Sequence, residues 1–67
     1  MKARDVMRRI EALGGVHVRT KGSHRLYRAG TCTTTVAGNP GHDIATGTLH
    51  QIQRDLAPEF GKGWLIK

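Results

Sequence analysis

The sequence predicts an α+β fold in which two helices cover one face of a three-stranded antiparallel sheet. Three observations lead to this prediction. Apolar residues recur at helical spacing near both ends of the 67-residue chain. Three short segments with β-strand character lie between them, separated by glycine-containing turns. A chain this short buries only about 60% of its unfolded surface, so we expect a single two-layer domain over residues 1–67.

The first helix is expected over residues 3–13. Its apolar stripe, at i, i+4, i+7 spacing with one further residue a turn earlier, consists of Ala3, Val6, Ile10 and Leu13. Gly14 and Gly15 follow directly and supply a C-terminal stop.

Three strands are expected next. They span residues 16–20, 24–28 and 31–36. The first two are joined through the turn Lys21-Gly22-Ser23 and run antiparallel. The alternation of the second strand is imperfect, because Leu26 and Tyr27 are adjacent and must point to opposite faces. The pattern therefore does not say which face His24 shares, although Tyr27 is more typical of a core than of a base-stacking surface.

The remaining segments are a loop, a second helix and an apolar tail. Residues 37–47 have loop chemistry, and Ile44 is expected to anchor this loop in the core. The second helix begins at Thr46 or Gly47, and Pro58 limits its extension. Its apolar stripe is Leu49, Ile52 and Leu56. The tail holds Phe60, Trp64, Leu65 and Ile66, which we expect to dock either on the chain's own core or on a partner.

The net charge of +6 lies entirely in the first 28 residues. They hold eight lysines and arginines and two acids, whereas the rest of the chain has three of each kind. Such asymmetry indicates a nucleic-acid-binding surface, and a merely solvated basic surface explains the charge alone equally well. The element order resembles the double-stranded-RNA-binding domain, a fold that contacts phosphates and 2′-hydroxyls rather than base edges.

The segment Lys21-Gly22-Ser23-His24 tips the balance towards a functional site. It places a histidine, which titrates near neutral pH, at a turn in the most basic part of the chain. The surrounding cations are Arg19, Lys21, Arg25 and Arg28. A proton carrier and positive charge are what cleavage of a phosphodiester beside a ribose 2′-hydroxyl requires.

With this turn followed by Gly47-Thr48-Leu49, the chain resembles the HicA, or YcfA-like, family of toxins from toxin–antitoxin pairs. The resemblance covers residues 1 to about 57. Two motifs carry it in order and at the right distance, the Lys-Gly-Ser-His turn at 21–24 and the helix start Gly47-Thr48-Leu49. Two departures stand out: Ala37 and Asn39 occupy a region where the family often has proline and histidine, and the tail beyond Pro58 is longer.

The resemblance implies a double-stranded-RNA-binding-like fold and a ribonuclease that cuts messenger RNA without the ribosome. It maps the catalytic histidine onto His24 and implies a HicB-like antitoxin that blocks the site. Lys21 and Arg25 are the first candidates for binding phosphate, ahead of Arg19 and Arg28. Gly22 and Ser23 complete the expected RNA-binding turn, although each also has a purely local role in turn formation.

No metal, cofactor or membrane is expected. The single Cys32 excludes an internal disulfide and suits a reducing cytoplasm. Cys32, His42 and His50 lack the spacing of metal ligands, and His17 is expected to face outward without a role. The N-terminal residues show no signal peptide, and no apolar run is long enough to cross a membrane.

Two alternatives remain open from the sequence. The first is a non-catalytic double-stranded-RNA-binding module, in which His24 only contacts ribose or phosphate. The second is a structural or regulatory subunit whose tail docks a partner and whose basic face is incidental. Loss of RNA cleavage on replacing His24 separates the toxin hypothesis from both.

Overall fold

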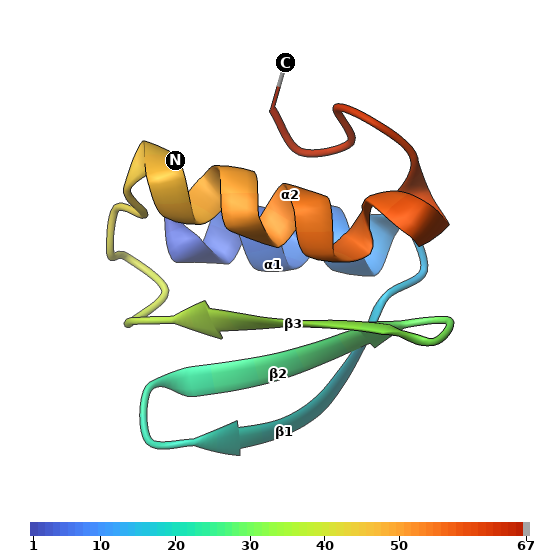
Figure 1. Ribbon diagram of the computed structural model, residues 1–67. Helices are drawn as coiled ribbons and strands as arrows, with labels where there is room; N and C mark the ends of the chain where they lie inside the picture. Colours follow the sequence, from blue (N-terminus) through green and yellow to red (C-terminus); the bar gives the residue numbers. More distant parts are fainter. Residues whose placement is uncertain (67) are drawn as a thin grey trace.

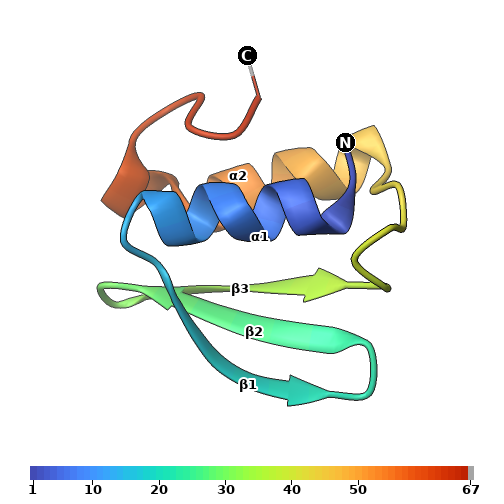
Figure 2. The same ribbon diagram turned by 180° about the vertical axis from the view of Figure 1, so that it is seen from behind.

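Both helices lie on one face of a three-stranded antiparallel sheet, as Figures 1 and 2 show from opposite sides. The computed structural model describes residues 1–66. The elements are α1 (Ala3–Ala12), β1 (Val16–Lys21), β2 (His24–Ala29), β3 (Cys32–Ala37) and α2 (Thr46–Phe60). Strand β2 lies between β1 and β3. The predicted fold class is therefore confirmed, including the position of both helices on one face.

Helix α1 buries the predicted stripe except at its last member. Ala3, Val6 and Ile10 are fully buried, and Met7 joins them in the core. Leu13 is the C-cap residue and remains 38% exposed. Because the helix has already ended at that point, this side chain no longer follows the helical stripe towards the sheet.

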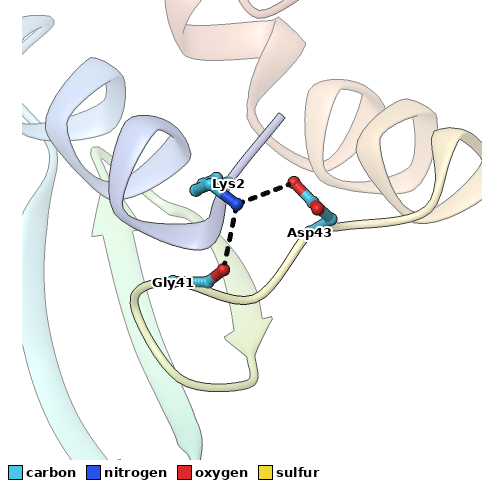
Figure 3. Close-up of polar contacts among 3 residues, drawn as sticks. All are labelled: Lys2, Gly41 and Asp43. Carbon is cyan, nitrogen blue, oxygen red and sulfur yellow. Dashed lines mark hydrogen bonds and ion pairs between the residues drawn. The ribbon is translucent and has the colours of Figure 1, made fainter.

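The loop between β3 and α2 satisfies the N-terminus of α1. Lys2 precedes the helix and provides no side-chain cap. Instead, the backbone N–H of Ala3 donates to the carbonyl of His42 at 2.8 Å. The Lys2 ammonium lies 3.3 Å from the Gly41 carbonyl and 3.4 Å from Oδ1 of Asp43 (Figure 3). The loop thus supplies an acceptor that the start of a helix would otherwise lack, and it is held close to α1.

The central strand β2 separates two chemically different faces of the sheet. Tyr27 and Ala29 are buried beneath the helices, each only 3% exposed. The alternate residues His24, Leu26 and Arg28 therefore point to the opposite side, which no helix covers. We call this side the open face. The interpretation of Tyr27 as a core residue is confirmed.

Strand β1 is an edge strand, and all six of its residues are exposed. Its pairing with β2 is irregular between His17 and Arg19, where Val18 is the extra residue. Such a bulge resets the alternation of side chains between the two faces. Val16, which pairs with Arg28, is 54% exposed and Val18 is 47% exposed, so the alternating pattern that predicted the strand does not mark a buried face.

Helix α2 closes the core over β3. It begins at Thr46, and its predicted stripe of Leu49, Ile52 and Leu56 is buried, as is the anchoring residue Ile44. The helix continues for two residues past Pro58, further than expected. The last turn persists, because the Gly61 N–H donates to the carbonyl of Ala57 at 2.7 Å.

The C-terminal tail folds back onto the side of the helices that faces away from the sheet (Figures 1 and 2). Trp64 is 5% exposed and packs edge-on against Phe60, with ring centroids 5.1 Å apart. Its indole N–H donates to the carbonyl of Gln53 at 2.8 Å. The side-chain oxygen of Gln53 accepts the backbone N–H groups of Leu65 and Ile66. Of the two expected partners for the tail, residues 61–66 therefore use the chain's own core.

Candidate active site

The open face brings His24 together with two cations from the neighbouring strand. Residues that lie directly opposite each other in an antiparallel pair share a face. Lys21 pairs with His24, and Arg19 pairs with Leu26, so all four side chains belong to the open face. Together with Thr35 of β3, they line a hollow of about 180 Å³. A hollow of the open face therefore contains the predicted catalytic histidine.

The hollow combines an apolar floor with a positively charged rim. Leu26 is half-buried, whereas Arg19, Lys21, His24 and Thr35 are exposed. Among residues 1–66, the one ion pair joins Lys2 to Asp43, so the cations of the hollow are not neutralised by a carboxylate there. An arrangement of this kind attracts an anionic ligand and leaves the histidine accessible to it.

The turn that carries His24 is a tight hairpin. Gly22 and Ser23 form the two-residue loop between the paired residues Lys21 and His24. Gly22 has a φ of 60°, and in the described part of the chain only glycines have a positive φ. This pattern is typical of the type II′ turn, which favours glycine at its first central position. No atom lies within 4 Å of the place where a Cβ of residue 22 would stand, so the turn is open to solvent.

The other predicted RNA-binding residues do not line the hollow. Arg28 is exposed on the open face, two positions beyond Leu26 on β2. Arg25 points to the helix side of the sheet, where its Nη1 donates to the carbonyl of Gly38 at 2.9 Å. Ser23 is exposed in the turn, and its backbone carbonyl accepts the Gly38 N–H.

Sequence reasoning missed Leu26 and Thr35 as components of the hollow. The adjacent pair Leu26-Tyr27 indicated that one of the two leaves the core, but the pattern did not say which. Thr35 belongs to a run of three threonines, and such a run is alike on both faces of a strand. The burial of Thr34, which donates to Oδ2 of Asp55 at 2.9 Å, and the pairing of Thr35 with Leu26 assign Thr35 to the open face.

His17 and Tyr27 make local contacts outside the hollow. A ring nitrogen of His17 lies 2.8 Å from the hydroxyl of Thr20, and its ring centroid is 5.3 Å from that of Tyr27. Burial, and to a smaller extent the charge of Glu11, raises the pKa of Tyr27, which keeps its phenol protonated. Within residues 1–66, no three His, Cys, Asp or Glu side chains are grouped as metal ligands.

The fold and the site together define the class of protein. The order helix, three antiparallel strands, helix, with a basic open face, is that of a double-stranded-RNA-binding-domain-like α+β protein. The family model described as "HicA toxin of bacterial toxin-antitoxin" matches residues 3–57. The chain therefore belongs to the HicA toxin family, and it is a toxin of a toxin–antitoxin system with an antitoxin as its partner. Residues 58–66, which include the docked Trp64, lie outside this match.

No curated protein and no solved structure matches the chain. None of the helices in residues 1–66 combines the length and the apolar character needed to span a bilayer.

Proposed function

We propose that this toxin is an endoribonuclease that cleaves messenger RNA and that His24 is its catalytic residue. The observation that supports this most directly is the hollow in which His24 meets Arg19 and Lys21. One side chain there can carry a proton, and two supply positive charge where a pentacoordinate phosphorane would form. The proposed RNA-binding set also includes Gly22, Ser23 and Arg28.

The chemistry follows from these residue types. The imidazole of His24 removes the proton of a ribose 2′-hydroxyl, whose oxygen attacks the adjacent phosphorus. The bond from phosphorus to the 5′-oxygen then breaks, and the same imidazolium returns its proton to that leaving oxygen. Arg19 and Lys21 stabilise the additional negative charge of the phosphorane. With a single imidazole serving both steps, the enzyme is expected to be slow for a ribonuclease.

Replacing His24 tests the proposal, and His50 supplies a matched control. His50 is an exposed histidine on α2, away from the lining of the hollow. We expect His24→Ala to lower the RNA cleavage rate by roughly 10²–10⁴-fold and to abolish growth arrest. His50→Ala should retain both activities. Circular dichroism checks that each variant is folded.

The outcome also separates the two classes of function. If the folded wild-type protein binds RNA but leaves it intact, the alternative of a non-catalytic RNA-binding module is favoured. Full activity of folded His24→Ala would assign the chemistry to another residue.

The proposed mechanism uses no metal ion and no cofactor. The histidine and cations of the hollow already provide proton transfer and charge stabilisation, and the described acids and histidines do not group as ligands. We expect cleavage of an unstructured RNA to continue at an unchanged rate in EDTA. Loss of activity that only one kind of divalent ion restores would contradict this mechanism.

We further propose that the antitoxin is HicB-like and covers residues 19–28. The positive charge of this segment favours an acidic partner, both for rapid association and for mimicry of phosphate. Amide hydrogen exchange of the toxin with and without its antitoxin tests this. Protection over residues 19–28 is expected, whereas protection confined to other segments would mean that inhibition occurs at a distance from His24.

A further inference from the structure

Arg25 follows His24 on β2, but its side chain lies on the other side of the sheet. The strand alternation that directs His24 to the open face directs Arg25 towards the helices, and residue 25 is half-buried. Its guanidinium donates from Nη1 to the carbonyl oxygen of Gly38 at 2.9 Å. A hydrogen bond from a charged donor is stronger than one between neutral groups.

The same glycine also holds the turn on the other side of His24. The backbone N–H of Gly38 donates to the carbonyl of Ser23 at 2.9 Å. This bond extends the β2–β3 ladder by one step beyond the pair His24–Ala37. Ser23 and Arg25 flank His24 in the chain, and both are bound to Gly38, so the backbone of His24 is held from both sides.

Gly38 lies close against His42, in a backbone conformation that favours glycine. Its φ is 96°, a region that side chains other than glycine rarely adopt. A Cβ built at this residue would lie 2.9 Å from Cδ2 of the His42 ring. His42 in turn accepts the N–H of Ala3 at the start of α1 through its carbonyl. Gly38 therefore connects the turn to the loop at His42, which contacts the start of α1.

We propose that Arg25 is a positioning residue, which holds the His24 turn through Gly38 and does not bind RNA. The inference rests on the proposed function, because it assigns Arg25 a role in the reaction of His24. The turn lies at the exposed end of a hairpin, where local opening is easiest. Displacement of a catalytic group by about 1 Å can lower a rate 10²-fold, so one hydrogen bond at this place has kinetic consequences.

Arg28 provides the matched comparison on the same strand. It is exposed on the open face and is a candidate for phosphate contact. We compare Arg25→Met with Arg28→Met, since methionine keeps an apolar stem and removes both charge and donors. The readouts are the single-turnover cleavage rate at saturating RNA, the dissociation constant, and its dependence on salt.

For Arg25→Met, we expect a single-turnover rate roughly 10- to 100-fold lower, with the dissociation constant and its salt slope close to wild type. For Arg28→Met, we expect a log–log salt slope smaller by about 0.7–0.9, as for the loss of one phosphate contact. A comparable loss of salt slope in Arg25→Met would show that this guanidinium contacts phosphate, which overturns the proposal. An unchanged rate in that variant would overturn it as well.

A measurement on the wild-type protein covers the case in which Arg25→Met does not fold. A 2′-deoxy oligonucleotide, which cannot be cleaved by the 2′-hydroxyl route, is added while the side-chain Nε–H signals of the arginines are followed by NMR. We expect the signals of Arg19 and Arg28 to shift and that of Arg25 to stay. We also expect the Gly38 amide to exchange slowly. A shift of Arg25 comparable to that of Arg28, or rapid exchange at Gly38, would overturn the proposal whether or not the protein cleaves RNA.

Discussion

The open face of the sheet differs in burial from the tail side of the helices, which is the side that faces away from the sheet and carries residues 61–66. The open face presents the exposed side chains of Arg19, Lys21 and His24 around one half-buried leucine. On the tail side, Trp64 is buried and bonded to Gln53. This small chain therefore carries its candidate chemistry on a surface with little buried area, whereas its tail adds Trp64 to the buried core.

The tail thereby enlarges a core that is otherwise limited by chain length. A small domain buries a low fraction of its surface, so one further large aromatic is a substantial addition. The carbonyl of Trp64 also accepts a hydrogen bond from Nε of Arg9 at 3.0 Å. The tail is thus joined to both α1 and α2, although it lies outside the family match.

The largest expected effect is on the tail side. Trp64→Ala should lower the free energy of unfolding by about 3–5 kcal/mol, because a buried indole is removed and leaves a cavity. The exposed Val18 on β1 is the control, and Val18→Ala should change the same quantity by no more than about 0.5 kcal/mol. Urea titration followed by far-UV circular dichroism measures both. Similar free energies of unfolding for the two variants would show that burial of Trp64 does not stabilise the fold.

A smaller effect is expected at Gln53. Its side-chain oxygen accepts two backbone N–H groups of the tail, so Gln53→Ala leaves both donors without this partner. We expect a loss of about 1–3 kcal/mol and a red shift of Trp64 fluorescence as the tail loosens.

A substitution at the nearby Gln51 distinguishes the loss of tail attachment in Gln53→Ala from a general effect of substitutions in α2. Gln51 is exposed, and within residues 1–66 its side chain bonds to Asp55 and Arg54 on the same helix. Gln51→Ala should stay within about 0.5 kcal/mol of wild type, with unchanged fluorescence. An equal loss in both variants would show that helix propensity, and not attachment of the tail, is being measured.

Substitutions on the open face should change RNA binding and leave the free energy of unfolding nearly unchanged. Arg19→Ala and Lys21→Ala should each reduce the log–log salt slope of RNA binding by about 0.7–0.9, one phosphate contact apiece. Each should leave the free energy of unfolding within about 0.5 kcal/mol of wild type, since both side chains are exposed. Arg54→Ala on α2 is the control for loss of a cation elsewhere. Equal slopes for all three variants would mean that the hollow does not contact the RNA backbone.

The order of elements and the segment that carries the candidate site follow from local patterns in the amino-acid sequence. Helical spacing placed Val6, Ile10, Ile52 and Leu56 in the core, and all four are buried. The Gly-Ser turn was sufficient to predict the hairpin, because a two-residue loop restricts the backbone locally. Both signals arise from residues within one or two turns of each other, which is the range over which a sequence pattern carries information.

The way in which those elements face one another depends on packing of the whole chain. Alternation in β2 assigns His24 and Leu26 to one face and Arg25 and Tyr27 to the other, but the helices decide which face is buried. The bond between Arg25 and Gly38 joins residues 13 positions apart, and that between Trp64 and Gln53 joins residues 11 apart. Contacts at such separations depend on packing of the whole chain, so no local pattern could predict that Arg25 is bonded to Gly38 or that the tail docks on its own helices.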